Sequence, residues 1–450
     1  MTDDQTAAQF DTKVMPYTTR FFAERGTEFD QAMAAPPLCC PARAGFLSGQ
    51  YPHNNGVDAN TPGYPLLREP DSTLPVWLRR AGYRTGFVGK YLNGYELVGG
   101  AEPAPGWDRW LQVQGYADYF GYDVSDDGDV SQAGTGPRDY STRLLTREAI
   151  HFADDASAGG DPFFLWLAYN APHTLTGGYP PPCDGIVAQP PSSRAYERFA
   201  DTPLPEPGSF DEADVSDKGR WVSSQQLGDG EIETMTKRWR CGLAALRAVD
   251  TGFHRLMESL EASGELDDTL VVFLSDNGYF FGEHRIADDK RLPYEPALRV
   301  PLAIRMPAGA DQPSRSDALV ANVDLAPTMI DLASARPCIA DRCRPPDGRS
   351  LVPLLTGDEG EWPHDRGVLV ELDDGFTYSA IRTPGHLYAE LTADRQGPLP
   401  QPETELYDLA ADPDELENLA GADPELEAGL AERLGALRRC AGTTGKAACE

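Results

Sequence analysis

Two pairs of neighbouring side chains in this 450-residue sequence carry oxygen atoms that suit a metal ion. Asp3 and Asp4 lie near the start, and Asp276 and Asn277 closely follow an apolar run that ends at Leu274. Carboxylate and amide oxygens are hard ligands, which favour Ca²⁺ or Mg²⁺, and neither pair contains a soft ligand for zinc. Each pair taken singly is typical of a helix cap or a turn. At the carboxyl ends of parallel strands, the two pairs would form one site.

A second segment offers a residue for covalent chemistry. It contains a cysteine, a proline two residues later and an arginine four residues later, in the run Leu38-Cys39-Cys40-Pro41-Ala42-Arg43, and it continues through Leu47-Ser48-Gly49 and Tyr51-Pro52-His53-Asn54. This run resembles the C-x-P-x-R signature of the type I sulfatases, which belong to the alkaline-phosphatase-like superfamily. The resemblance implies that a formylglycine-generating enzyme oxidises Cys39, and not Cys40, to formylglycine during maturation.

The resemblance extends to residues far from this signature. It implies a Ca²⁺ site, with Mg²⁺ as the alternative, and an active site of cationic side chains around it. Its metal ligands are Asp3, Asp4, Cys39, Asp276 and Asn277, and its catalytic residues are Cys39, Arg43, Lys90, His173 and Lys290. The sequence has only six lysines, so Lys90 and Lys290 are notable as compact ammonium groups that arginine does not replace.

Within the family, the sequence is most similar to the N-acetylglucosamine-6-sulfatase branch. The similar segments are Leu38-Cys39-Cys40-Pro41, Gly89-Lys90-Tyr91-Leu92-Asn93 and Asp289-Lys290-Arg291. Many arylsulfatases have a histidine at the position of Leu92, and its absence here favours that branch. His284 follows Gly282-Glu283, as in some sulfatases, but it is equally typical of a loop histidine, so we do not include it in the site.

The implied reaction is hydrolysis of a sulfate monoester, in which hydrated formylglycine attacks the sulfur. Lys90 and Lys290 would neutralise the sulfate oxygens, and either Lys290 or His173 would protonate the leaving alcohol. The substrate is a small-molecule or glycan sulfate, a sugar or an aryl sulfate. The irregular segment from Gly177 to Gly230 is expected to choose between them. Two alternatives remain: a phosphonate monoester or phosphodiester hydrolase of the same superfamily, and a non-catalytic protein that binds sulfated glycans.

The overall charge restricts the partners. There are 39 Lys and Arg against 71 Asp and Glu, a net charge of −32. Such a surface repels phosphate backbones and acidic lipids, so we expect neither nucleic-acid nor membrane binding. An anionic substrate must then be met by a local cluster of cations, and its association should become faster as salt rises.

The chain pattern that must position these residues is α/β. Short apolar runs at residues 84–88, 163–169, 269–274 and 300–304 predict strands, and residues 233–260 predict a helix that ends at Ser263-Gly264. This alternation is typical of a mostly parallel sheet between helices. We assign residues 1–360 to this catalytic domain. Residues 361–450 form a small α+β subdomain, with strands at 367–372, 377–382 and 386–391, a closing strand near 405–409 and a helix at 424–439.

The two ends of the sequence carry further expectations. The resemblance implies a central first strand ending at the acidic pair, but only Met1 and Thr2 precede Asp3. We therefore expect this strand to be missing, the sequence to be truncated at its start, and the metal ligands to be held loosely.

The cysteines bear on the compartment. The close pairs Cys338/Cys343 and Cys440/Cys449 are plausible disulfides, which would favour an extracellular or cell-envelope location; free thiols in a cytosolic protein are the alternative.

Overall fold

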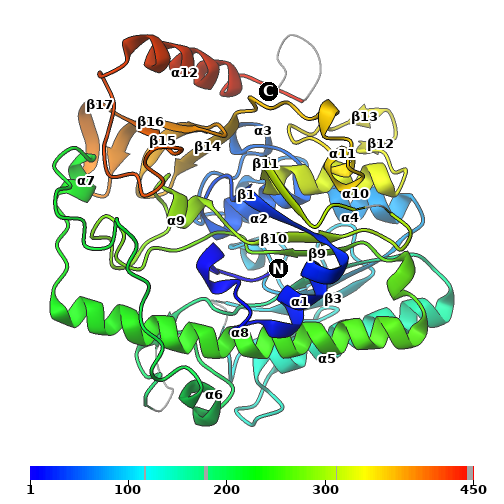
Figure 1. Cartoon of the computed structure of the whole chain (residues 1–450). Coiled ribbons are helices and arrows are strands. Elements are labelled where there is room, and N and C mark those ends of the chain that lie inside the picture. Colours follow the sequence, from blue (N-terminus) through cyan, green and yellow to red (C-terminus); the bar gives the residue numbers. More distant parts are fainter. Residues whose placement is uncertain (116–117, 177–180, 311, 443–448, 450) are drawn as a thin grey trace.

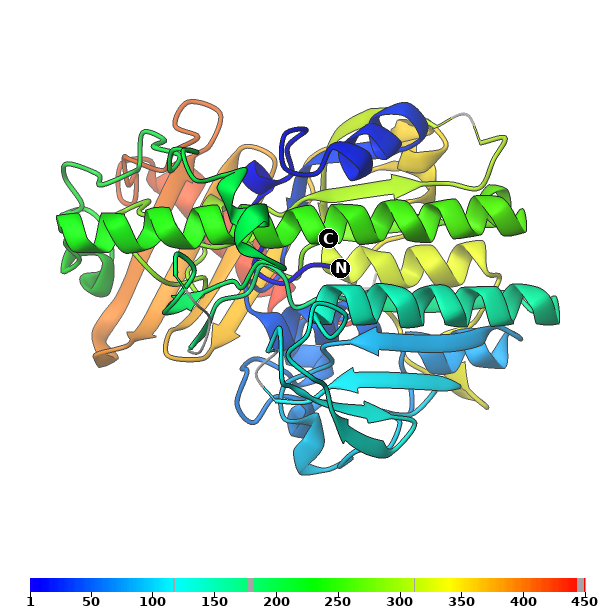
Figure 2. The ribbon, with the colours of Figure 1, turned by 90° about the horizontal axis from the view of Figure 1, so that it is seen from below.

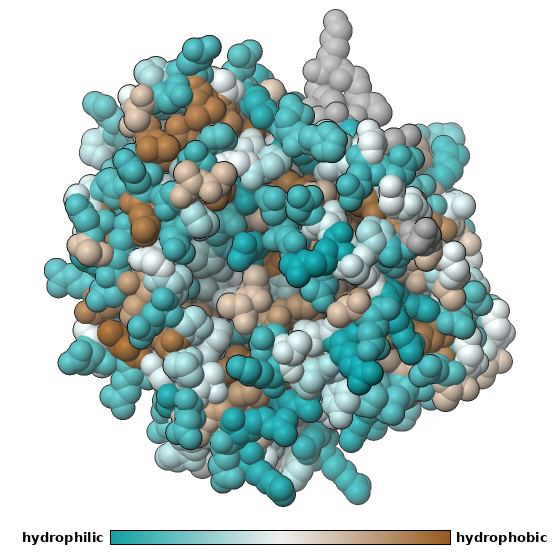
Figure 3. Space-filling model, in the orientation of Figure 1, coloured by the Kyte–Doolittle hydropathy of each residue, from teal (hydrophilic) through white to brown (hydrophobic). Residues whose placement is uncertain are grey.

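The computed structural model describes residues 1–115, 118–176, 181–310, 312–442 and 449. It has three layers, a central sheet with helices on each face, and a second, smaller sheet beside them (Figure 1). None of the helices in these ranges has both the length and the apolar character needed to span a bilayer. The face seen in Figure 3 is mainly hydrophilic, with apolar residues in small separate groups, as the charge of −32 leads one to expect.

The central sheet consists of two hydrogen-bonded halves. One half has the order β11-β1-β10-β9, with β1 (Thr27–Met33), β9 (Val271–Leu274), β10 (Leu302–Arg305) and β11 (Arg315–Ala321). The other has the order β5-β4-β3-β2-β6, with β2 (Arg84–Gly89), β3 (Arg109–Val113), β4 (Asp123–Asp126), β5 (Asp129–Gln132) and β6 (Phe163–Ala168). Pairing is parallel for β1–β11, β2–β3 and β2–β6, and antiparallel for the other neighbours.

The first three residues join the two halves. The N–H of Thr2 donates to Leu274 O (2.9 Å), next to β9, and the N–H of Asp3 donates to Ala171 O (3.1 Å), just after β6. Both bridges run parallel. Following the pairings across the joined sheet, only β4 and β10 run against the other strands. The predicted α/β class with a mostly parallel sheet is therefore confirmed.

The first residues fill only part of the space between β6 and β9. Beyond the bridges, β6 and β9 flank an apolar cavity of about 620 Å³, lined by Phe163 to Leu167 on one side and Thr269 to Leu274 on the other. The expectation that the metal ligands are held loosely was wrong. Asp3 and Asp4 are buried, because the backbone bonds of the first residues to both half-sheets fix them in place.

Helices cover both faces of the sheet. One face carries α1 (Pro16–Arg25), α5 (Ser141–Gly159) and α8 (Asp229–Ser263), which lie in front in Figure 2. The other carries α2 (Cys39–Ser48), α4 (Leu74–Arg80) and α10 (Leu325–Leu332). Helix α8 begins where Glu231 accepts a hydrogen bond from the N–H of Gly228 (2.8 Å), and it ends at Gly264 in a left-handed conformation. The predicted helix is thus confirmed, with its end at Ser263-Gly264, and it begins four residues before the predicted residue 233.

Shorter elements fill the connections. The helices are α3 (Pro52–Asn55), α6 (Ser193–Glu197), α7 (Arg220–Ser223), α9 (Glu295–Leu298) and α11 (Val352–Leu355). Single turns of 3₁₀ helix occur at Ala7–Gln9, Tyr64–Leu66, Tyr95–Leu97, Leu266–Asp268, Asn322–Asp324 and Glu359–Glu361. Two-residue strands form two small pairs, β7 (Leu175–Thr176) with β8 (Ile186–Val187) and β12 (Cys338–Ile339) with β13 (Arg342–Cys343).

The C-terminal sheet is antiparallel and has the order β14-β15-β16-β17, with β14 (Val368–Asp373), β15 (Thr377–Arg382), β16 (His386–Asp394) and β17 (Gly397–Asp408). Helix α12 (Pro424–Leu437) packs on β15 and β16. These elements confirm the predicted α+β region, whose boundary at residue 360 stays a prediction. Strand β17 is longer than the predicted closing strand, because prolines at 398, 400 and 402 mask it in the sequence. An edge strand tolerates proline, since one side of it needs no partner.

Candidate active site

Cys39 is the first residue of α2 and lies at the centre of the predicted site. Its side chain is buried, with Sγ 2.9 Å from Lys290 Nζ and 3.5 Å from Asp3 Oδ1. Burial raises the pKa of the Cys39 thiol to about 12, and the charge of Lys290 only partly offsets this. The thiol therefore keeps its proton at neutral pH and is a weak nucleophile as it stands.

The predicted metal ligands come together from distant parts of the chain. Possible ligand atoms of Asp3, Asp4, Cys39 and His173 all lie within 4.8 Å of one another. Asp276 is adjacent, since its Oδ1 accepts a bond from the N–H of Asp4 (3.2 Å). The contact between Asp4 and Asp276 links residues 272 positions apart in the chain.

Asn277 completes this cluster. Its Nδ2 donates to Asp4 Oδ1 (2.7 Å). Its Oδ1 is buried and has no hydrogen-bond partner among the described residues. An unsatisfied buried acceptor beside two carboxylates fits a hard cation better than it fits a closed structural network. The oxygen atoms present therefore suit the predicted Ca²⁺ or Mg²⁺, and His173 lies beside them.

Arg43, in α2, is fully buried and ties this cluster together. Its Nε donates to Asp276 Oδ2 (2.8 Å), its Nη2 to Asp3 Oδ2 (3.1 Å) and its Nη1 to Lys90 O (2.5 Å). Arg43 therefore orients two carboxylates and the backbone at Lys90, and its guanidinium acts on the site through them.

Lys90 and Lys290 place two ammonium groups against the carboxylates. Lys90 Nζ lies 2.5 Å from Asp3 Oδ2, and Lys290 Nζ contacts Asp4 Oδ1. Burial alone would lower the pKa of both lysines, but the facing carboxylates raise both pKa values above the ordinary range. In turn, burial acts to raise the pKa of Asp3, and the charges of Lys90, His173 and Arg43 more than reverse this. Both lysines are therefore cationic over the physiological range.

His173 stands at the more open side of the cluster. Its Nε2 is 3.8 Å from Asp4 Oδ2, and its Nδ1 has no partner among the described residues. Burial, helped by the charge of Lys90, lowers the pKa of His173 below its usual value. The ring is therefore mainly neutral at pH 7.

The strand ends explain why these residues meet. Lys90 follows β2 directly, and its N–H donates to Ala168 O (3.0 Å) at the end of β6. Gly89 has φ +132°, and a Cβ there would lie 1.8 Å from Ala168 O, so only glycine allows the chain to leave β2 at this point. The parallel strands β2, β6 and β9 thus end together and present Lys90, His173 and Asp276 along one edge.

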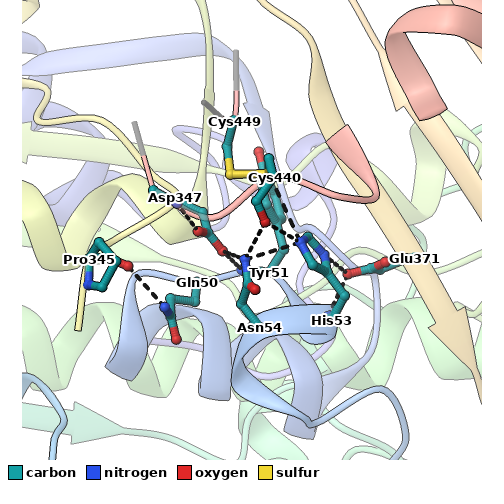
Figure 4. Close-up of a disulfide and its surroundings, with 10 residues drawn as sticks. Gln50, Tyr51, His53, Asn54, Pro345, Asp347, Glu371, Cys440 and Cys449 are labelled. Carbon is teal, nitrogen blue, oxygen red and sulfur yellow. Dashed lines mark hydrogen bonds and ion pairs between the residues drawn. A yellow bond between two sulfur atoms is a disulfide. The ribbon is translucent and has the colours of Figure 1, made fainter. Parts of the chain in front are cut away.

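The residues that extend the signature do not reach this cluster. Figure 4 shows His53 and Asn54 beside the disulfide of the C-terminal tail. His53 Nδ1 contacts Glu371 (2.7 Å), and its Nε2 and the Asn54 side chain both contact Cys440 O (2.9 Å). Asn54 Nδ2 also donates to Asp347 Oδ2 (2.9 Å). The segment that follows α2, Tyr51-Pro52-His53-Asn54, therefore binds the C-terminal tail.

His284 also lies apart from the cluster. It is buried and its Nδ1 contacts Glu212 Oε2 (2.7 Å), while its Nε2 faces Glu415 (3.9 Å). Leaving it out of the predicted site agrees with this geometry. Of the segment from Gly177 to Gly230, residues 177–180 lie outside the described residues, and the role expected for it in substrate choice stays a prediction.

Three disulfides are present among the described residues. Cys338–Cys343 and Cys440–Cys449 confirm the two predicted pairs, and Cys39 and Cys40 are free. Sequence reasoning missed Cys183–Cys241, whose partners are 58 positions apart and lie in a loop and in α8. No local sequence pattern predicts a disulfide between such distant cysteines.

Fold and site together define an α/β enzyme in which cations and carboxylates surround a buried cysteine. Comparison with known proteins identifies its family. The sequence profile of the Sulfatase family matches residues 1–335, and the human N-acetylglucosamine-6-sulfatase is 32% identical over 496 aligned residues, covering 99% of this chain and 84% of the human protein. The chain therefore belongs to the sulfatase family and is a sulfuric ester hydrolase.

Solved structures share this fold. One, a complex with its substrate D-glucosamine-2-N,6-O-disulfate, has a TM-score of 0.76 at 24% identity and covers 97% of this chain and 95% of its own. The phosphonate monoester hydrolase of Agrobacterium radiobacter has a TM-score of 0.69 at 21% identity and covers 97% of this chain and 94% of its own. At these identities the likeness is one of fold alone.

Proposed function

We propose that the protein hydrolyses the sulfate monoester of a sugar, with Cys39 converted to formylglycine and a divalent cation, Ca²⁺ first, held beside it. The observation that carries this proposal is the setting of Cys39, a buried thiol with a raised pKa between an ammonium group and a carboxylate. Its raised pKa keeps the thiol protonated at neutral pH, so it suits a residue that is modified before it acts.

The proposed ligands are Asp3, Asp4, Asp276, Asn277 and the oxygen of converted residue 39. When bound, the cation would stabilise negative charge on the sulfate and on the hydrated aldehyde. Asn277 supports this assignment, because its Oδ1 otherwise lacks a partner among the described residues.

The remaining roles follow from the side chains. Lys90 and Lys290 bind sulfate oxygens and offset the charge that shifts onto them as the ester bond breaks. Arg43 keeps Asp3 and Asp276 in position. His173 donates the proton to the leaving alcohol, because Lys290 holds its own proton too tightly beside Asp4 to release it readily.

A sugar substrate is favoured over an aryl sulfate by the relatives. The human protein that is 32% identical over nearly the whole chain is named for N-acetylglucosamine 6-sulfate, and a structural neighbour was solved with a sulfated glucosamine. The Volvox carteri arylsulfatase is equally identical, but it aligns with only 80% of this chain. We therefore take a glucosamine sulfate as the first substrate class.

A second candidate function is phosphonate monoester hydrolysis, which the fold of the Agrobacterium enzyme favours. Comparing kcat/KM on p-nitrophenyl sulfate and p-nitrophenyl phenylphosphonate separates the two. Sulfatase function predicts the higher value for the sulfate. A higher value for the phosphonate would reassign the enzyme.

The deciding experiment is mass spectrometry of the peptide that contains Cys39, on protein produced with a formylglycine-generating enzyme. We expect an aldehyde at position 39 and a thiol at position 40, together with turnover of the sulfate ester. A thiol at position 39 in active protein would refute the mechanism. A thiol in inactive protein would instead support a protein that only binds sulfated glycans.

The proposed location is outside the cytosol. Three disulfides among the described residues favour an oxidising compartment, and two relatives are named extracellular sulfatases. Oxidation of Cys39 would precede complete folding, because its side chain is 1% exposed in the folded protein.

A further inference from the structure

A chain of contacts leads from Cys40, the neighbour of Cys39, to the C-terminal sheet and from there back to Cys39. The N–H of Cys40 donates to Asn60 Oδ1 (2.9 Å), and the N–H of Asn60 donates to Asp374 Oδ2 (2.8 Å). Asp374 Oδ1 accepts from Arg291 Nε (3.3 Å). Arg291 is next to Lys290, whose Nζ lies 2.9 Å from Cys39 Sγ. Asp374 is in the turn between β14 and β15, so the small sheet reaches the active site here.

Burial changes along this chain. Cys39 and Lys290 are buried, whereas Asn60 is half-buried and the side chains of Asp374 and Arg291 keep 22% and 27% of their exposure. Solvent reaches these three residues but not Cys39 or Lys290. They are therefore the members of this chain of contacts that a sugar ring can touch.

The carboxylate of Asp374 is unexpected beside an anion-binding site, because its negative charge repels an anionic substrate. Arg291 neutralises that charge, and Asp289 fixes Arg291, since Asp289 Oδ1 accepts from the N–H of Arg291 (3.1 Å) and faces its Nη1 (3.3 Å). Arg395 contacts the other oxygen of Asp289, so the two carboxylates and two guanidinium groups carry no net charge together. Asp374 and Arg291 can therefore act on a substrate through directional hydrogen bonds.

The hydrogen-bonding capacity of this pair is incompletely used. Each oxygen of Asp374 accepts one bond and retains a second lone pair. Within the described residues, neither Nη2 of Arg291 nor Nδ2 of Asn60 contacts an acceptor. The two oxygens of Asp374 are acceptors, and Arg291 and Asn60 on either side of it provide donors. A hydroxyl group both donates and accepts a hydrogen bond, so neighbouring hydroxyls of a sugar ring fit this arrangement.

We propose that Asp374, held between Asn60 and Arg291, is a specificity residue that binds hydroxyl groups of the sugar ring carrying the sulfate. This inference rests on the proposed sulfatase function and deepens it. An aryl sulfate has no hydroxyl to offer at this position, so Asp374 distinguishes the two substrate classes. The small C-terminal sheet thereby supplies the substrate preference, and the large domain supplies the reaction.

The test compares Asp374→Asn with wild type on N-acetylglucosamine 6-sulfate and on p-nitrophenyl sulfate. Asn has nearly the same shape but replaces one acceptor oxygen with a donor and removes the charge. We expect kcat/KM for the sugar sulfate to fall roughly 10- to 100-fold, mainly through KM, as for the loss of charge-assisted hydrogen bonds. The value for p-nitrophenyl sulfate should change by less than about threefold.

Asp373→Asn is the matched control, because the neighbouring carboxylate is exposed and its Oδ1 accepts only from Thr377 (2.7 Å) within the same hairpin. It should alter neither substrate. Equal losses of Asp374→Asn on both substrates would show that Asp374 only supports Cys39, and unchanged values on both would show no role; either result overturns the inference. Wild-type protein that cleaves p-nitrophenyl sulfate but not the sugar sulfate would overturn it too, while leaving the sulfatase function intact. Wild-type protein that cleaves neither would instead count against the proposed function.

Discussion

At the scale of single residues, the active site depends on charges that neutralise one another in a buried space. Lys90 faces Asp3, Lys290 faces Asp4, and Arg43 joins Asp3 to Asp276. Removing one partner leaves a buried charge without compensation, which is more costly than losing an exposed ion pair. Substitutions in this cluster should therefore be read with a stability measurement beside the activity.

Cys39→Ser tests the need for a converted residue. Serine keeps one oxygen but cannot form the hydrated aldehyde, so we expect no multiple turnover and a loss of at least about a thousandfold in kcat. Cys40→Ser is the matched control, because Cys40 is equally buried and, among the described residues, its Sγ contacts only Asn93 O (3.8 Å). It should keep its activity within about threefold. Steady turnover by the Cys39→Ser protein in a continuous sulfate-release assay would contradict the mechanism.

The proton donor gives the reaction its expected pH dependence. The pKa of His173 lies below its usual 6.5, so its acid form is lost as the pH rises through that lower value. We therefore expect kcat to be highest in the mildly acidic range and to fall toward neutral pH. In His173→Gln this fall should disappear and kcat should be roughly 100-fold lower. An unchanged pH profile in the variant would transfer the donor role to Lys290.

At the scale of elements, the order of the strands brings the site together, and the first residues complete it. Met1 to Asp3 stand between β6 and β9, and the apolar cavity of about 620 Å³ continues between the same two strands. Among the described residues, β6 pairs with β2 and β9 with β10, and their other edges face each other across the cavity. Such a space suits one more extended apolar segment.

Six or so apolar β-branched residues added before Met1 should therefore stabilise the protein. They would bury apolar surface and pair with β6 and β9, and each buried side chain contributes about 1.5–3 kcal/mol. We expect a clear increase in Tm, measured by calorimetry. A Gly/Ser extension of the same length is the control and should give no increase. An equal change for both extensions would show that the cavity does not accept a strand.

A second element-scale feature joins the catalytic domain to the C-terminal region through His284. Burial would lower the pKa of His284, but its hydrogen bond to Glu212 and the nearby carboxylate of Glu415 raise it to about 9, and burial raises the pKa of Glu415 to about 7. Because the pKa of His284 is raised on folding, its protonation stabilises the fold fully below about pH 6.5. This stabilisation is lost as the pH rises from 6.5 through about 9. A raised glutamate pKa acts in the same direction, its contribution falling between about 4.5 and 7.

The free energy of unfolding should therefore fall by on the order of 3 kcal/mol between neutral pH and pH 9.5, judged from the size of the His284 shift. Urea titrations across this range measure it. In His284→Gln the dependence should be largely removed, whereas His254→Gln, which changes an exposed histidine in α8 paired with Glu258, should keep it. A pH dependence equal in both variants would place its origin elsewhere.

At the scale of the whole molecule, the charge of −32 stands against the local cations that receive an anionic substrate. Long-range repulsion slows the approach of the sulfate, and salt screens it within a Debye length of about 10 Å at 0.1 M. We expect kcat/KM to stay constant or rise between about 0.02 and 0.2 M NaCl. Potassium gluconate at equal ionic strength is the control for chloride binding. A steep fall with both salts would mean that local cations dominate the approach of the substrate.

The sequence by itself determined the family and the order of the main elements, and it predicted the residues of the active site. It did so because the signature around Cys39 and the residues that end β2, β6 and β9 are local patterns that the chain must carry wherever this chemistry is done. The tertiary structure decided how these residues share their contacts. Only it shows that Arg43 contacts Asp3 and Asp276, that Asp374 from a second sheet contacts Arg291, and that Cys183 pairs with Cys241. The physical reason is that hydrogen bonds and ion pairs between residues hundreds of positions apart leave no periodicity in the sequence, whereas strands and helices do.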